Sequence, residues 1–374
     1  LSNTGLYNLK NNGNGVFTNQ IMSSYTSTDF LRVDINGDNL QDIIIRDLDY
    51  KLDYYQQNIT GTYTFKETMD SFVVNGSNNS FIVSGDIDAD GDIDIAVMHE
   101  NGGDKRIKWY KNNNNVFANF LTLILMPNDD TGITNEDTRS ILLKDFDNDG
   151  LVDVVMQHSF LNRISWYKNL GVALGFGSEQ IISNSIINNR SIAMGDINNN
   201  AKQDIICVGR TNSDVVWFDN TTGLGNTFIK NQIGQSINNP SKISIGDIDG
   251  DGKKDVLVTS TSDDKLSWYR NINGLGDFSE RQKIITNTLI DAQNGLLVDM
   301  NNDGKNDIIA LSLTFVTNPA PKLVQFLNLG NGQFSPEQLI YSVSNDNINK
   351  IEAIDVDDDG DLDIVASSVL GDMK

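Results

Sequence analysis

The sequence contains seven copies of one acidic pattern, D-x-[DN]-x-[DN]-x-x-x-D, which begin 51 to 59 residues apart. Side-chain oxygens at positions one, three and five, a backbone carbonyl at position seven and a carboxylate at position nine can surround one Ca²⁺ with hard ligands. A glycine at position six permits the sharp turn that such a loop requires. The pattern therefore predicts one calcium loop in each repeat.

The seven loops differ in their number of carboxylates. Four have Asp at all four side-chain positions, and their predicted ligands, with the residue at position seven, are Asp86, Asp88, Asp90, Asp92 and Asp94; Asp145, Asp147, Asp149, Leu151 and Asp153; Asp247, Asp249, Asp251, Lys253 and Asp255; and Asp355, Asp357, Asp359, Asp361 and Asp363. Two are lighter, with Asp34, Asn36, Asp38, Leu40 and Asp42, and with Asp299, Asn301, Asp303, Lys305 and Asp307. The remaining loop has Asp196, Asn198, Asn200 and Asp204, with Ala201 at the turn. We predict about six Ca²⁺ sites and a weak or empty seventh.

A solvated turn is the alternative interpretation of any single acidic loop. Seven copies in strict phase disfavour it, because carboxylates packed this closely repel one another at neutral pH without a counterion. We expect the role of calcium to be structural. The nine loop positions use up the coordination of the metal and leave little room for a substrate.

The segments around each loop predict short strands. Apolar runs such as residues 191–194 and 255–258 enter and leave the loops, and an aromatic strand ending in Asn follows, as in residues 166–169. A Gly-rich turn and a fourth strand complete a unit of about 53 residues, which is typical of a propeller blade. The chain starts with a third and fourth strand and ends with a first and second. We therefore predict an all-β, seven-bladed β-propeller spanning residues 1–374 as one domain, with a blade shared by the two termini.

These loops, together with the W-Y-x-N strand, resemble the FG-GAP/VCBS repeats whose best-known examples form the head of integrin α-subunits. The resemblance covers essentially the whole chain and implies Ca²⁺ in the loop between strands one and two, usually in secreted or cell-surface proteins. The literal F-G and G-A-P elements are mostly missing, and residues 175–177 are the nearest trace. Partner recognition of the integrin type is therefore not implied. The Asn-rich, Cys-poor composition is more similar to a bacterial VCBS-type member.

Differences between repeats indicate where specificity lies. Two long connections, residues 126–139 and 313–321, are predicted on the face opposite the calcium loops. The residue five positions after the last loop Asp falls near the same face and is Asp47, His99 and His158 in the first three units. Turn positions accept polar residues freely, so chance is one interpretation. The others are a polar site for a ligand or second metal, and a catalytic base. The tryptophans recur in four units, and we expect them to pack in the core.

Composition excludes several classes of function. A formal charge of −23, from 51 acidic and 28 basic residues, disfavours nucleic-acid binding and docking on anionic membranes. No apolar run approaches the roughly 20 residues of a spanning helix, so we expect no membrane insertion. Cys207 is the only cysteine, which excludes disulfides, and its apolar neighbours predict a core position rather than a reactive thiol.

These observations favour a binding or adhesion propeller that is secreted or displayed on a cell surface, stabilised by calcium, and part of a larger multidomain protein. The expected partner is an extracellular glycan or protein on the face opposite the calcium loops. A polysaccharide lyase or hydrolase, or its accessory domain, is one alternative. An enzyme of this kind would need a cluster of Arg, Lys, Tyr or His on one face, and the sequence offers only the weak group of Asp47, His99 and His158. We therefore predict no enzymatic activity. An architectural spacer in a surface protein is the other alternative.

Overall fold

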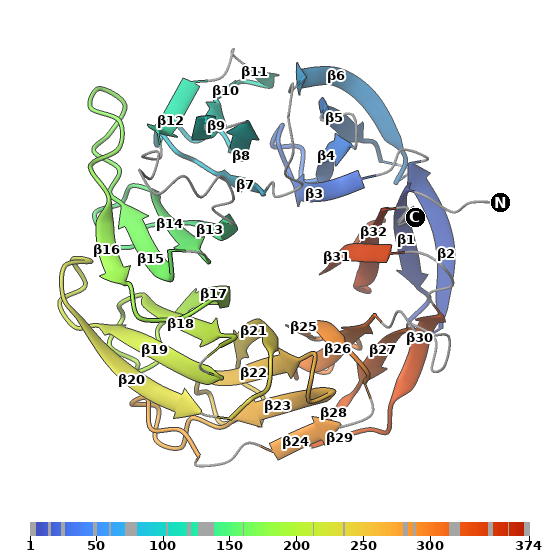
Figure 1. Ribbon diagram of the computed structural model, residues 1–374. Coiled ribbons are helices and arrows are strands. Elements are labelled where there is room, and N and C mark those ends of the chain that lie inside the picture. The colour runs from blue at the N-terminus through green and yellow to red at the C-terminus, as the bar shows by residue number, and fades with distance from the viewer. Residues whose placement is uncertain are drawn as a thin grey trace.

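Short runs of β-branched and aromatic residues form strands throughout the chain, because such side chains pack well on a pleated surface. The strands form seven four-stranded antiparallel sheets, arranged as blades around a central opening (Figure 1). The computed structural model describes residues 5–13, 16–23, 27–47, 51–59, 61–71, 81–101, 104–117, 121–125, 138–159, 161–211, 213–234, 236–279, 283–286, 289–313, 322–342, 347–357 and 359–369. The predicted all-β, seven-bladed propeller is confirmed.

Each blade runs outward from the centre in the same strand order. The first, innermost strands are β3 (Ser27–Val33), β7 (Ile82–Gly85), β13 (Thr138–Lys144), β17 (Asn189–Gly195), β21 (Pro240–Gly246), β25 (Ala292–Val298) and β31 (Asn347–Ile354). The second strands are β4 (Asp42–Asp47), β8 (Asp94–Asn101), β14 (Asp153–His158), β18 (Asp204–Gly209), β22 (Asp255–Ser260), β26 (Asp307–Ser312) and β32 (Asp363–Val369). Every second strand therefore begins at the last Asp of its acidic loop.

The outer half of each blade continues this order. The third strands are β5 (Lys51–Gln57), β9 (Asp104–Tyr110), β15 (Arg163–Tyr167), β19 (Asp214–Asn220), β23 (Lys265–Tyr269), β27 (Lys322–Phe326) and β1 (Gly5–Asn11). The fourth strands are β6 (Tyr63–Ser71), β12 (Leu121–Leu125), β16 (Gln180–Ser183), β20 (Phe228–Gly234), β24 (Lys283–Thr286), β30 (Gln338–Ser342) and β2 (Phe17–Ser23). Two small hairpins add β10 (Asn112–Asn113) with β11 (Val116–Phe117), and β28 (Asn328–Gly330) with β29 (Gln333–Phe334).

One blade combines both ends of the chain, as the sequence predicts. Its sheet order is β2-β1-β32-β31, and β1 pairs with β32 so that Leu6 lies opposite Ser367 and Leu9 opposite Ile364 (Figure 1). This pairing joins the last blade to the first strands of the chain and closes the ring. A closed ring protects sheet edges that would otherwise pair with other chains.

Antiparallel pairing places successive connections on alternate faces of the ring. We call the face with the loops between first and second strands the acidic face. The opposite face carries the turns between second and third strands and the connections from one blade to the next. The starts of the innermost strands also lie on the opposite face, around the central opening.

The hydrophobic core lies between neighbouring blades, which pack face to face. Val155 and Trp166 of one blade, for example, cluster with Ile205 and Val216 of the next. The four tryptophans are at most 8% exposed, which confirms their predicted packing role. Trp166 lies so close to Gly225 of the next blade that any side chain at this glycine would clash with the indole. The tryptophans are therefore not available for stacking on a sugar.

The Asn that follows or ends the third strand joins neighbouring blades. Asn271 is fully buried, and its Nδ2 donates to the carbonyl of Ile197 in the preceding blade at 2.9 Å and to that of Lys254 in its own loop at 3.2 Å. Equivalent pairs of bonds are made by Asn11, Asn112, Asn169, Asn220 and Asn328. In the remaining blade, Gln57 donates to the carbonyl of Val356. A circle of side-chain hydrogen bonds thus links all seven blades beneath the acidic face.

Candidate metal centres

The structure brings the carboxylates of four acidic loops together. In each cluster, one oxygen from each of three Asp side chains lies within 4.8 Å of the other two. The clusters are Asp86, Asp88 and Asp90; Asp145, Asp147 and Asp153; Asp247, Asp249 and Asp251; and Asp355, Asp357 and Asp359. These are the four loops with a full set of carboxylates in the sequence. The described residues of the other three loops form no such cluster.

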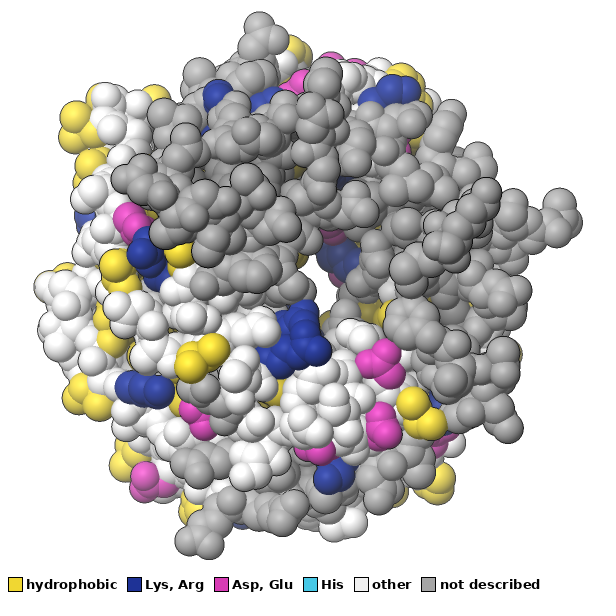
Figure 2. Space-filling view, in the orientation of Figure 1, with side chains coloured by type: hydrophobic (Ala, Val, Ile, Leu, Met, Phe, Trp, Pro, Cys, Tyr) yellow, Lys and Arg dark blue, Asp and Glu magenta, His cyan; other side chains and the backbone are white. Residues whose placement is uncertain are grey.

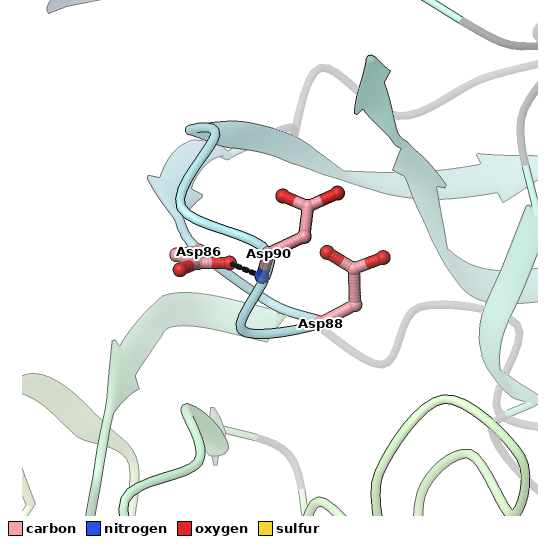
Figure 3. A group of neighbouring side chains, drawn as sticks. All are labelled: Asp86, Asp88 and Asp90. Carbon is pink, nitrogen blue, oxygen red and sulfur yellow. Dashed lines mark hydrogen bonds between the residues drawn. The ribbon is translucent and has the colours of Figure 1, made fainter.

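Backbone N–H groups fix the shape of each loop. In the loop of Figure 3, Asp86 accepts hydrogen bonds from the backbone N of Asp90 and of Gly91, both at 3.0 Å. The carboxylates of Asp88 and Asp90 lie side by side, and Asp90 accepts a bond from the backbone N of Asp92 at 3.0 Å. The loop backbone therefore orients the first and fifth side chains, and Lys111, which directly follows the third strand, also contacts Asp90 at 2.8 Å.

Position six of the loop requires a left-handed backbone. Gly91 has a φ of +96° there, but Asn39 and Ala201 occupy the same position with φ of 67° and 63°. This conformation costs a residue with a Cβ roughly 1–2 kcal/mol, least for Asn. Ala201 thus adds strain to the loop that the sequence predicts to bind metal most weakly.

Position nine is a buried anchor between loop and blade. The Asp255 carboxylate accepts hydrogen bonds from the backbone N of Asn271 at 2.8 Å and of Ile248 at 3.1 Å. Burial raises the pKa of the equivalent carboxyls to about 6 in Asp94, Asp153, Asp255 and Asp363, and to about 7 in Asp204. A divalent cation in the loop would favour the ionised form of these groups. Among the four clusters, only that of Asp145 includes its position nine.

Position three has a partner that the sequence argument missed, at position x of W-Y-x-N. Lys168 contacts both Asp147 and Asp149, the latter at 2.7 Å. Arg270 contacts Asp249 at 2.5 Å, and a lysine makes the same contact in the other two full loops, as Lys111 with Asp88 and Lys10 with Asp357. Each of the four loops with Asp at position three therefore has a cation in the third strand or directly after it.

The three loops with Asn at position three lack this cation. Their strand residues are Gln56, Asp219 and Leu327. In one of them the polarity of the pair is reversed, because the Asn198 Nδ2 donates to Asp219 Oδ1 at 3.1 Å. The signal for this pairing was present in the sequence, since the two positions change together from repeat to repeat.

The inner oxygen of position three provides a test of whether a cation fits the loop. Asp88 is 2% exposed; its Oδ2 contacts Lys111, while its Oδ1 is buried and accepts no hydrogen bond. The Oδ1 atoms of Asp147 and Asn198 are buried and unpartnered in the same way. A buried oxygen without a donor costs about 1–3 kcal/mol, and a bound cation would remove that cost. The residues present therefore fit a hard metal ion, including in the loop of Asn198.

The structure places two of the three predicted ligand residues of the opposite face inside their blades. Asp47 is 7% exposed and accepts a hydrogen bond from the backbone N of Lys51 at 2.8 Å, which closes the turn after β4. His158 is 3% exposed, with its Nε2 3.4 Å from the Ser165 hydroxyl. The His99 side chain and the extensions at 126–137 and 314–321 lie outside the described residues. A joint site of Asp47, His99 and His158 stays a prediction.

Fold and loops together define a repeat propeller with an acidic loop in every blade. The sequence profile of the FG-GAP-like repeat matches residues 34–97, 86–156, 145–207, 196–258 and 247–310, which together are more than half of the chain. The chain therefore belongs to the FG-GAP-like repeat family. No curated protein matches it in sequence.

Two solved structures share the fold over most of their length. An Agrocybe aegerita lectin, described as recognising non-reducing terminal N-acetylglucosamine, has a TM-score of 0.66 and 17% identity over 90% of both chains. BBS1N, solved in complex with ARL6DN, has a TM-score of 0.53 and 16% identity over 99% of this chain and 98% of that chain. Identities this low establish the fold alone. In the described part of this chain, no helix could cross a membrane.

Replacing Asn198 by Asp should lower the free energy of unfolding of the metal-free protein by about 1 kcal/mol, because the new carboxylate would face Asp219. Adding Asp219→Lys should recover this loss, since it recreates the ion pair that Lys168 makes in the preceding blade. Chemical denaturation of both single variants and the double variant in EDTA measures the coupling, which we expect to be about 1–2 kcal/mol.

Asp214→Lys is the matched control, because it makes the same charge change on β19 at the end far from the loop. If it rescued Asn198→Asp as well as Asp219→Lys does, the effect would be a general reduction of negative charge rather than a specific pair.

Proposed function

We propose that this protein is a calcium-stabilised binding propeller that acts outside the cell and recognises a glycan or protein ligand through its opposite face. The calcium assignment is supported by the Oδ1 atoms of Asp88, Asp147 and Asn198, which are hard oxygens buried without a hydrogen-bond donor. The carboxylate at position nine and the backbone hydrogen bonds hold each loop in a conformation that would bind the ion. Calcium would neutralise the loop carboxylates and stiffen each blade from within.

The opposite face supports the binding role because the repeat loses its symmetry there. Where one blade has Arg190 and Arg210, the next has Ser241 and Thr261 at the equivalent positions. The acidic loops, in contrast, keep the same role from blade to blade. A ring of similar units can discriminate between ligands only where its units differ. The Agrocybe aegerita lectin and BBS1N add that propellers of this fold bind a sugar and a protein.

A glycan array is the direct test of this proposal. In millimolar Ca²⁺ the protein should bind a restricted set of glycans, and EDTA should weaken that binding because the blades lose their metal. Release of reducing ends or unsaturated uronates from the same glycans would instead identify an enzyme. A folded, calcium-loaded protein that retains no glycan and no purified cell-surface protein would contradict the binding role.

A further inference from the structure

The opposite face contains a pocket at the mouth of the central opening. Its volume is about 420 Å³, and it is formed by the starts of the innermost strands and by the turns that follow β18 and β22. The lining includes Arg190, Arg210, Asn239, Thr261 and Asp291. Figure 2 shows Lys and Arg side chains gathered at the edge of this opening. The residues of this pocket come from several blades, so no local sequence pattern indicates it.

Two arginines give the pocket a positive charge. Arg190, which is partly buried, lies at the start of β17, and Arg210 lies in the turn after β18. Burial lowers the pKa of Arg190, and the neighbouring charge of Arg210 lowers it further. Within the described parts of the chain, no carboxylate forms an ion pair with either guanidinium. Two like charges are thus held together without a counterion from the described residues.

This arrangement occurs in a chain with a formal charge of −23. Several other basic side chains in the described residues have carboxylate partners: Arg163 contacts Glu179 at 3.0 Å, and Lys350 contacts Asp29 at 3.0 Å and Glu352 at 2.9 Å. Acidic residues exceed basic ones nearly twofold in the sequence, yet no acidic side chain that the structure describes forms an ion pair with Arg190 or Arg210. An anion from outside the chain would remove the repulsion between them.

The other groups of the pocket restrict the kind of anion. The Asn239 Nδ2 donates to the Thr261 hydroxyl at 2.5 Å and to the Ser262 hydroxyl at 3.2 Å, so Asn239 and Thr261 offer mainly acceptor oxygens to a ligand. Phe81 adds an apolar surface. Asp291 also lines the pocket, where its Oδ1 accepts a hydrogen bond from Gln293 at 2.8 Å. A carboxylate at this place repels a second negative charge but accepts hydrogen bonds from hydroxyl groups. The pocket therefore suits a molecule with one anionic group next to several hydroxyls.

We infer that this pocket binds a uronate residue of an acidic polysaccharide, with the sugar carboxylate held by Arg190 and Arg210 and the sugar hydroxyls by Asn239, Thr261 and Asp291. Guanidinium groups bind carboxylates in a planar, two-pronged geometry that a neutral sugar cannot provide. The aromatic ring of Phe81 supplies a surface for the apolar face of the sugar. This inference rests on the proposed binding function and specifies its ligand class. Arg190 and Arg210 belong to the same blade. Among the described residues of the ring, this is the one pocket that contains such a pair of arginines.

Isothermal titration with a galacturonate trisaccharide, and with a neutral galactose trisaccharide of equal length, tests the inference. Calcium is kept at the same concentration in both solutions. Wild-type protein should prefer the uronate by at least about tenfold, because the sugar carboxylate would accept charge-assisted hydrogen bonds that a neutral sugar cannot form. Arg190→Gln and Arg210→Gln should each remove at least about tenfold of the uronate affinity and leave the melting temperature unchanged. The control is Lys265→Gln, which removes one positive charge from the same face outside the pocket.

The possible results separate this inference from the proposed function. Uronate affinity that survives both Arg→Gln changes, or that falls equally with Lys265→Gln, would overturn the inference. Inorganic sulfate that binds as tightly as the trisaccharide would also overturn it, since the sugar would then contribute nothing. Binding of neutral glycans alone would refute the uronate site but leave the binding function standing. If an Arg→Gln variant is less stable, Arg210→Lys keeps the charge, and a loss of affinity there supports the two-pronged geometry.

Discussion

Millimolar Ca²⁺ should raise the melting temperature of the metal-stripped protein by about 10 °C or more. Each site that is saturated a hundredfold above its dissociation constant adds about 2.7 kcal/mol to the stability of the folded state, and the structure shows four carboxylate clusters. Thermal melting followed by circular dichroism in EDTA, in Ca²⁺ and in Mg²⁺ measures the shift. Mg²⁺ should produce a smaller increase, because it demands a near-octahedral shell and gives up its water reluctantly.

Variants of the loops show whether this shift comes from the sites described. Asp249→Ala should reduce the calcium-dependent increase, because Asp249 lies in a cluster of three carboxylates. Asp214→Ala is the control, since it removes an acidic group outside the loops. Melting curves that are identical in EDTA and calcium, or an equal loss from both variants, would contradict the assignment of the loops as calcium sites.

Asn271→Ala should lower the free energy of unfolding by about 2–4 kcal/mol. The change leaves the carbonyls of Ile197 and Lys254 without the donors that they have in the native protein, and each buried, unsatisfied group costs about 1–3 kcal/mol. It also removes one link between two neighbouring blades. Urea denaturation in saturating calcium measures the loss without interference from metal release.

Asn273→Ala is the matched control for this variant. Asn273 is exposed in the turn after the same strand. Its Nδ2 donates to Asp277 at 2.6 Å, and its Oδ1 accepts from the backbone N of Leu275 at 2.8 Å and of Asp277 at 3.4 Å. Water can replace these exposed bonds, so removing the side chain should cost less than about 1 kcal/mol. Equal losses from Asn271→Ala and Asn273→Ala would mean that the circle of inter-blade hydrogen bonds contributes little to stability.

The fold could be predicted from the sequence because its strongest signals are local and repeated. An acidic loop, an apolar strand and an aromatic strand recur in order, so one unit predicts the next, and the phase at the termini predicts the shared blade. The four carboxylate clusters are likewise local, since each comes from nine consecutive residues. The seven blades of the ring follow from counting these loops.

The remaining features depend on contacts that consecutive residues do not reveal. Lys168 and Asp147 are 21 residues apart, and only the antiparallel return of the third strand brings them together. Asn271 reaches a carbonyl 74 residues earlier, across a blade boundary. Arg190 and Arg210 each resemble ordinary surface residues in the sequence. They share a pocket because β17 and β18 are antiparallel neighbours, so the start of β17 and the end of β18 lie side by side at the central opening.

The shared blade also determines how the ring responds to mechanical tension. Gly5 pairs with Ser368 at the end of the β1–β32 ladder where β1 begins and β32 ends. The two ends of the chain therefore leave the blade at the same point. A force that pulls them apart would load the bonds between β1 and β32 one pair at a time, as in opening a zipper, rather than all at once in shear. The ring would then open at this blade at low force while the other six carry almost no load. An assembly that transmits tension through both ends would therefore weaken here first, and calcium in the loop of Asp355 would stiffen the same blade.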